Sequence, residues 1–197
     1  MNWYIILLHL FLVVLLLVVV SRWFILRIRL RSLTVILIES LTKHDVEYWV
    51  DFGTLLGIYR DDDIIWKDED VDICVVESPE LHEKMKKVIE DLDKKGYKII
   101  KAKWDAYRVT NKYKYIIGGS YIADLYINNR ILENGIYKGA TGENSDIPME
   151  FISVPKLFTW KKCDIQVKVP ENIHKTLVWR YGNDYMTPKS GYKGRDS

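Results

Sequence analysis

The chain's fold is decided by Tyr48-Trp49-Val50-Asp51-Phe52-Gly53-Thr54-Leu55-Leu56-Gly57-Ile58-Tyr59-Arg60, together with Ile64-Ile65-Trp66-Lys67-Asp68-Glu69-Asp70-Val71-Asp72-Ile73 a few residues later. The aromatic and β-branched run at 47–50 predicts a short strand. The turn after it leads into a short helix over 55–60. Beyond a polar break, the apolar run over 70–76 predicts a second, buried strand.

The first candidate for binding is the glycine turn between the first strand and the helix. Backbone N–H groups at a helix N-terminus bind phosphate, and glycine lets a ligand approach closely. Gly53 and Thr54 are therefore candidate phosphate-binding residues. An ordinary turn glycine is the alternative, and this signal alone does not exclude it.

The second candidate is the acidic pair that opens the next strand. Residues i and i+2 of a strand share a face, with Cα atoms about 6.5–7 Å apart, so Asp70 and Asp72 converge while Val71 and Ile73 point to the core. Carboxylates about 5 Å apart repel by about 3 kcal/mol at an effective dielectric near 20. A divalent cation converts that repulsion into binding. A solvated acidic turn is the alternative, and it suits residues 61–63 better than this pair.

A lone carboxylate, Asp124, interrupts the apolar strand predicted over 120–127. Such a residue is often a structural aspartate whose hydrogen bonds are made within the protein, or a charge that keeps an exposed edge strand from pairing with another chain. On a strand beside Asp70 and Asp72, it would instead complete a magnesium site.

The rest of the body alternates helices and strands, which predicts an α/β fold with a mixed sheet. Helices are expected over 32–44, 79–95 and 171–181; strands over 97–101, 106–110, 113–117 and 167–169; a hairpin turn at Gly118-Gly119; and a surface loop over 133–147.

The composition of the N-terminal segment predicts a single-pass membrane anchor that is retained rather than cleaved. Residues 3–20 carry no charge, and 18 helical residues span about 27 Å, close to the hydrocarbon thickness. Four arginines follow before the first acidic residue, Glu39. By the positive-inside rule they favour a cytosolic body. The expected division is an anchor over 1–26, a basic juxtamembrane segment with the start of the first helix over 27–40, a domain over 41–189 and a tail over 190–197.

The quoted segments resemble the LicD/fukutin family, in which a G-[ST]-LLG segment, an arginine and a W-D-x-D-x-D-like segment occur in this order. The C-terminal segments at 169–172 and 180–188 also resemble the family's closing segment. The resemblance covers about residues 41–189. It implies a nucleotidyltransferase-like mixed sheet flanked by helices. One departure is the family's Pro-Trp, which here is Trp66-Lys67 and is displaced by one residue.

The resemblance implies an enzyme that moves a phospho-alcohol, such as phosphocholine or ribitol phosphate, from a CDP-alcohol donor to a glycan or glycoconjugate hydroxyl and releases CMP. Asp70, Asp72 and Asp124 would be catalytic and would bind Mg²⁺ or Mn²⁺. The residues expected to bind substrate are Gly53, Thr54, Arg60, Asp68, Tyr181 and Asp184. Likeness to fukutin implies a Golgi or secretory membrane, whereas the arginines favour a cytosolic face.

Two other functions stay open from the sequence. The domain could transfer the nucleotide itself to a small acceptor, or it could be an inactive membrane-tethered binding module. From residue 32 onward acidic residues slightly outnumber basic ones, so no nucleic-acid partner is expected. The two cysteines, Cys74 and Cys163, match no metal-site spacing, and whether they pair is left open.

Overall fold

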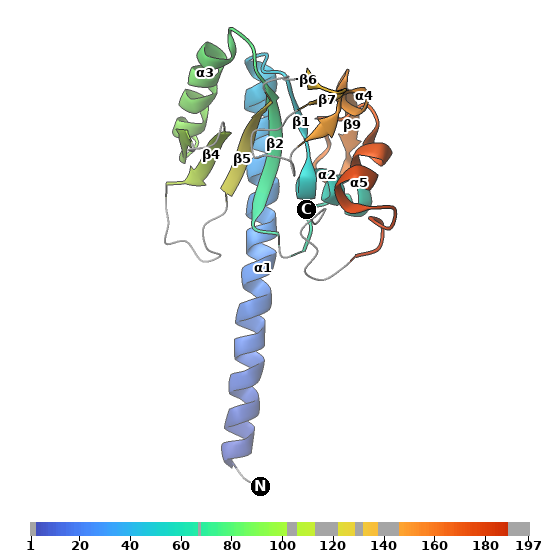
Figure 1. Cartoon of the computed structure of the whole chain (residues 1–197). Helices are drawn as coiled ribbons and strands as arrows, with labels where there is room; N and C mark the ends of the chain where they lie inside the picture. The colour runs from blue at the N-terminus through green and yellow to red at the C-terminus, as the bar shows by residue number, and fades with distance from the viewer. Residues whose placement is uncertain are drawn as a thin grey trace.

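The computed structural model describes residues 3–66, 68–101, 106–112, 122–128, 132–137 and 146–188. Its centre is a five-stranded sheet in the order β1-β2-β5-β4-β3 (Figure 1). Strands β2 and β5 are parallel, and the other neighbouring pairs are antiparallel. The predicted mixed α/β sheet is therefore confirmed. The strands are β1 Tyr48–Val50, β2 Asp70–Val76, β3 Tyr97–Lys101, β4 Ala106–Asn111 and β5 Ile122–Asn128.

Alternation along β2 gives the sheet two buried faces. Val71, Ile73 and Val75 are fully buried in the main core with helices α1 (Trp3–Lys43) and α3 (Leu81–Lys94). Cys74 and Val76 belong to a second, smaller core with residues of α4 (Met149–Ile152). The period of two that predicted Val71 and Ile73 as core residues is confirmed.

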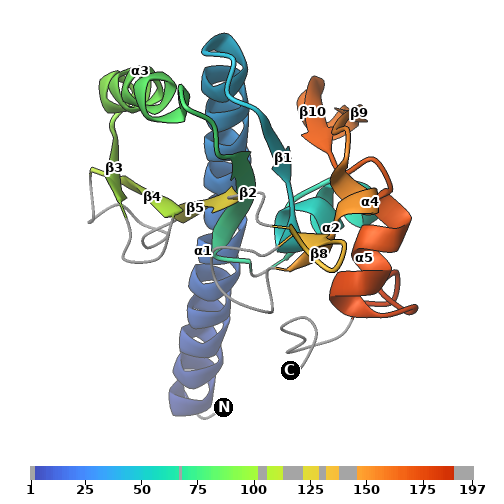
Figure 2. The same cartoon turned by 45° about the horizontal axis from the view of Figure 1, so that its top comes forward.

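A second group of elements lies beside β1 (Figure 2). It comprises α2 (Phe52–Asp61), the antiparallel pair β9 (Lys156–Trp160) and β10 (Ile165–Val169), and α5 (Ile173–Tyr181). A 3₁₀ turn over Lys161–Cys163 joins β9 to β10. The Asn172 side chain caps α5 by accepting the Lys175 N–H at 3.0 Å. These elements bring the closing segment, residues 169–172 and 180–188, close to the glycine turn.

Helix α1 is a single unbroken helix of 41 residues, not an anchor followed by a separate helix over 32–44. Neither glycine nor proline occurs within it, so nothing in the sequence ends the helix between the apolar run and the domain. Residues 4–20 are exposed, whereas Leu26, Leu30 and Leu33 are almost fully buried against the domain. The segment over 27–40, expected to be juxtamembrane, is thus packed into the main core. Among the described residues, α1 is the one helix long and apolar enough to cross a membrane.

Two further differences concern short strands. The expected loop over 133–147 contains parts of a three-stranded sheet, formed by β6 (Leu132–Glu133), β7 (Ile136–Tyr137) and β8 (Ile147–Pro148). Asn134 and Gly135 turn β6 into β7 with positive φ angles of 53° and 78°, a conformation these residue types tolerate well. Strand β9 was not predicted from the sequence. The strand expected over 113–117 and the Gly118-Gly119 turn lie outside the described residues.

Candidate active site

The glycine turn begins at Asp51, the N-cap of α2, whose side chain accepts the Phe52 N–H at 2.8 Å. Phe52 has φ 48°, an uncommon conformation for a residue with a bulky side chain. Gly53 faces the acidic segment, because a Cβ placed on it would lie 2.9 Å from Asp68 Oδ2 and 4.0 Å from Asp72 Oδ2. The sequence-predicted Gly53, Asp68 and Asp72 are therefore neighbours in space.

Thr54 has a structural contact that the sequence did not indicate. Its hydroxyl oxygen accepts the backbone N–H of Asp72 at 2.8 Å, and its side chain is buried. Thr54 therefore ties the start of α2 to the start of β2. This bond fixes the acidic segment relative to the glycine turn.

The acidic segment places three carboxyl groups together. Asp68, Asp70 and Asp72 are all partly buried. Burial, followed by the charge of Asp70 and a hydrogen bond with it, raises the pKa of Asp68 to about 7. Burial and then the charge of Asp70 raise the pKa of Asp72 well above its usual range, and burial also raises the pKa of Asp70. Within the described ranges no ion pair reaches these three groups.

Asp124 lies where the sequence predicted, but it already has a cationic partner. Asp72 and Asp124 are register neighbours on parallel strands β2 and β5, and Arg108 is opposite Asp124 on β4. The guanidinium of Arg108 donates two hydrogen bonds to Asp124, with Nε–Oδ1 2.7 Å and Nη2–Oδ2 2.8 Å. The carboxylate of Asp124 is buried, and this bidentate pair satisfies its charge.

The predicted substrate-binding residues differ in how close they lie to Asp68, Asp70 and Asp72, which together are called here the acidic edge. The phenol of Tyr181 is near it: burial first, and then the charges of Asp72 and Asp51, raise its pKa strongly. Arg60 instead pairs with Asp61 at 2.8 Å and donates to the Tyr185 carbonyl at 3.3 Å. Asp184 is an exposed residue just past α5. Tyr181 thus joins the acidic edge, whereas the contacts of Arg60 tie α2 to the closing segment.

Sequence reasoning missed the buried pair Asp51–Arg180. Both side chains are almost inaccessible, and Arg180 Nη2 lies 2.8 Å from Asp51 Oδ2. Arg180 also donates to the Asp146 carbonyl at 3.1 Å and lies 4.2 Å from the centre of the Phe52 ring. The closing helix α5 therefore holds the start of the glycine turn. An aspartate that opens the turn before a predicted helix was the available signal, but its partner is 129 residues away and no local pattern links them.

Two of the three predicted metal ligands, Asp70 and Asp72, suit a divalent cation in this arrangement. Carboxylate oxygens are the preferred ligands of Mg²⁺ and Mn²⁺, and Asp70 and Asp72 offer them without an ion-pair partner among the described residues. Gly53 leaves open a space beside Asp68 and Asp72 that a Cβ would fill. Asp124 as it stands is held by Arg108. Across the described residues, no three His, Cys, Asp or Glu side chains are grouped closely enough to hold an ion in this arrangement.

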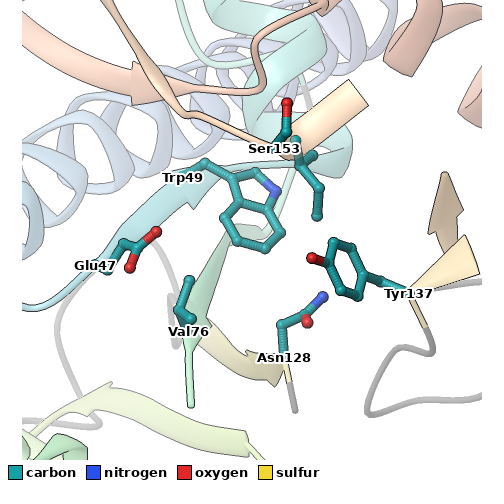
Figure 3. Close-up of a pocket in the computed structure, with 7 residues that line it drawn as sticks. Glu47, Trp49, Val76, Asn128, Tyr137 and Ser153 are labelled. Atoms are coloured by element: carbon teal, nitrogen blue, oxygen red, sulfur yellow. The ribbon is translucent and has the colours of Figure 1, made fainter. Parts of the chain in front are cut away.

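A small recess lies at the opposite end of β2 (Figure 3). Its volume is about 30 Å³, space for one or two water molecules. Trp49, Val76 and Asn128 line it, with the phenol of Tyr137 directed toward the indole of Trp49 (Figure 3). Because Asp70 opens β2 and Val76 ends it, this recess is separate from the acidic edge.

A glycine turn facing an Asp-x-Asp pair at the start of a buried strand in a mixed sheet defines the nucleotidyltransferase class of domain. The family model described as "LicD/FKTN/FKRP, nucleotidyltransferase domain" matches residues 45–172. The chain belongs to this family. The resemblance stated from the sequence is therefore confirmed, and so is the fold that it implied.

The curated relatives carry no functional description. An uncharacterised protein of Rickettsia typhi is 32% identical over 89 residues, which cover 45% of this chain and 25% of that protein. An uncharacterised protein of Rickettsia prowazekii is 36% identical over 61 residues, which cover 31% and 22%. The matched region thus spans about a quarter of the length of these relatives.

The solved structures are more distant. A crystal structure of ANT(2″)-Ia in complex with adenylyl-2″-tobramycin has 10% sequence identity and a TM-score of 0.43, covering 75% of this chain and 71% of that one. A solution structure of the antibiotic-resistance factor ANT(2″)-Ia has 12% identity and a TM-score of 0.37, covering 59% and 62%.

Proposed function

We propose that the protein is a membrane-anchored, metal-dependent phosphotransferase that moves a phospho-alcohol from a CDP-alcohol to a glycan or glycoconjugate hydroxyl. The observation that carries the proposal is the acidic segment. Asp70 and Asp72 open β2 beside the Gly53 turn, in a chain of the LicD/FKTN/FKRP family, with no cation of the described chain paired to them. Carboxylates that are gathered and left unneutralised favour a bound cation over a purely structural role.

The chain's own residues bind and orient the donor in this proposal. The backbone of the Gly53 turn, at the N-terminus of α2, approaches the donor phosphates. Arg108 is held rigidly by Asp124 and lies close enough to Asp70 for its charge to act on that carboxyl. It thereby adds a fixed positive charge beside the phosphates. Tyr181 provides an aromatic surface at the same edge.

Asp70 and Asp72 are the residues that would hold Mg²⁺ or Mn²⁺. The cation, when bound, neutralises the charge of the donor pyrophosphate and of the leaving CMP. Asp124 stays a candidate third carboxylate, and its use as a ligand would require Arg108 to turn away. Tyr126 donates a hydrogen bond to Asp72 Oδ1 at 3.3 Å and so orients that carboxylate.

The test is donor-dependent release of CMP. Full-length protein in detergent would be incubated with a panel of CDP-alcohols, an oligosaccharide acceptor mixture and Mn²⁺, and CMP would be followed by mass spectrometry. We expect release with at least one CDP-alcohol and none with the Asp72→Asn protein. Asp62→Asn is the matched control, because Asp62 lies in the polar break after α2, outside the acidic segment, and its φ of 51° is one that asparagine tolerates.

The same assay separates the two functions left open by the sequence. A second panel of nucleoside triphosphates tests nucleotidyl transfer, which would release pyrophosphate in place of CMP. A third measurement follows the melting temperature with added Mn²⁺, because a ligand that binds the native state stabilises it. No release from either panel, together with no Mn²⁺ shift, would contradict the enzyme proposal and favour the binding module.

A further inference from the structure

We infer that the loop over 61–66 and the adjoining exposed face of α1 rest on the surface of a lipid bilayer, and that they hold the acidic edge beside the lipid headgroups. This inference rests on the membrane anchoring proposed above. It concerns a surface formed by Phe24, Ile28 and Trp66, called here the headgroup-facing surface.

The loop is clamped to α1 just beyond the apolar run. Asp63 pairs with Arg31 at 2.7 Å and with Arg27 at 3.3 Å. Arg27 Nε also donates to the Ile64 carbonyl at 2.7 Å. Asp63 is buried, so Arg27 and Arg31 neutralise a carboxylate within the protein. The loop therefore has a fixed place along the helix.

That place is close to the end of the apolar run. Arg27 is seven residues beyond Val20, which is about 10 Å at the helical rise of 1.5 Å per residue. The headgroup layer on each side of a bilayer is about 5–8 Å thick. Trp66 lies against Arg27, whose guanidinium carbon is 5.7 Å from the centre of the indole ring. Arg27 therefore lies roughly 2–5 Å outside this layer, and an indole whose centre is 5.7 Å from its guanidinium carbon is within reach of the layer's outer boundary.

The exposed side chains at this height have the chemistry of an interface. Phe24, Ile28 and Trp66 are 55%, 43% and 42% exposed, although all three are large and apolar. Aromatic side chains at this depth are typical of the boundary between lipid and water. A bilayer is the partner that fits, because α1 carries both the apolar run and two of the three residues of this surface, Phe24 and Ile28.

The acidic segment begins immediately after this surface. Asp68 is two residues from Trp66, and β2 then rises toward the far end of α1, where Val76 bonds to the Glu47 carbonyl at 2.9 Å. Figure 1 shows β2 starting at the end of the sheet nearer to the protruding half of α1. The Trp49 recess, at the other end of β2, faces away from the bilayer.

The test measures the depth of single spin labels. Full-length protein with Cys163→Ser would be reconstituted in vesicles of phosphatidylcholine and phosphatidylglycerol, and Trp66→Cys would be labelled. Lys87→Cys is the matched control, because Lys87 is an exposed residue of α3 near Asp91, which pairs with Lys43 about 30 Å beyond Arg22 along α1. Phe24→Cys marks the headgroup layer. Unlabelled Cys74 is buried.

We expect the label at 66 to lose collisions with a water-soluble nickel complex and to gain collisions with oxygen, as the label at 24 does and the label at 87 does not. Equal nickel collisions at 66 and 87 would overturn the inference. Extraction at alkaline pH distinguishes this result from a failed anchor: a chain that washes off the vesicles contradicts the proposed anchoring, whereas a retained chain with a water-exposed label contradicts the headgroup-facing surface alone.

Discussion

Two sets of aspartates lie around the start of β2, and they differ in their partners. Asp51, Asp63 and Asp124 are buried, and each is paired with at least one arginine. Asp68, Asp70 and Asp72 are partly buried, and no ion pair reaches them from the described residues. The first set joins distant segments: α5 to the glycine turn, α1 to the loop over 61–66, and β4 to β5. In the second set, Asp72 accepts a hydrogen bond from Tyr126 of β5, but no ion pair among the described residues links any of the three to another segment.

This difference shows how the same side chain acquires two roles. A buried carboxylate with an arginine is satisfied, and its removal leaves an uncompensated charge in the protein. A gathered carboxylate without one has a raised pKa and a stored repulsion that a ligand can relieve. We therefore expect substitutions in the first set to lower stability and those in the second to lower activity.

The largest effect, on the free energy of unfolding, is expected for Asp51→Ala. It leaves the guanidinium of Arg180 buried without its carboxylate, and breaking a buried pair costs about 3–5 kcal/mol. Urea denaturation of the full-length protein in detergent would measure the loss. The double variant Asp51→Asn/Arg180→Met should recover part of it, because it removes both charges. A loss below about 1 kcal/mol, the value typical of exposed pairs, would place Asp51 outside the first set.

The next effect is on turnover. Asp72→Asn should lower CMP release at least about 100-fold, which corresponds to about 3 kcal/mol of lost transition-state stabilisation. The melting temperature should not fall, because the substitution removes repulsion with Asp70 and Asp68. Equal turnover of wild type and Asp72→Asn in Mn²⁺ would remove Asp72 from the second set.

A smaller effect on activity is expected for Gly53→Ala. Gly53 has no positive φ angle, so alanine strains no backbone, and the new methyl group meets only the far end of the Asp68 side chain at 2.9 Å. We expect about a tenfold loss of turnover, near 1.4 kcal/mol, from the displaced carboxylate. Thermal unfolding should be almost unchanged. A fall in melting temperature without a loss of turnover would make Gly53 a structural glycine.

The smallest effect is expected at the opposite end of the domain. Asp91 bonds to Lys43 and His44, and these hydrogen bonds lower its pKa to about 2. A lowered pKa contributes stability above the unfolded-state value near 4, and this contribution is lost as the pH falls through the folded-state value. The melting temperatures of wild type and Asp91→Asn should therefore differ slightly at pH 6 and converge between pH 4 and pH 2. A gap that widens on acidification would reverse the sign of this argument.

Local patterns predicted the elements that carry the site. The period of two placed Val71 and Ile73 in the core and Asp70 and Asp72 on the other side, and the glycine after a strand marked the turn. What could not be predicted were the partners across long sequence separations. Arg108 opposite Asp124 depends on the order of strands in the sheet, and Arg180 against Asp51 depends on the path of the closing segment.

Residues 61–63 show the same limit in another form. Three consecutive aspartates indicate a solvated break, and Asp61 is indeed exposed. Asp63 is buried, because α1 continues without a break and carries Arg27 and Arg31 to it. A pattern read over a few residues could not show that a helix more than thirty residues earlier would supply the counter-charges.

The unbroken path of α1 also determines how the edge encounters other molecules. With its apolar run in a bilayer, a helix without a hinge keeps the domain at one height and leaves it only lateral diffusion and rotation about the membrane normal. Any reactant residing in the same leaflet is then met by a search in two dimensions. Turnover of such a reactant would follow its number per unit area of membrane. Dilution with inert lipid would slow it, whereas a change in the aqueous volume would not.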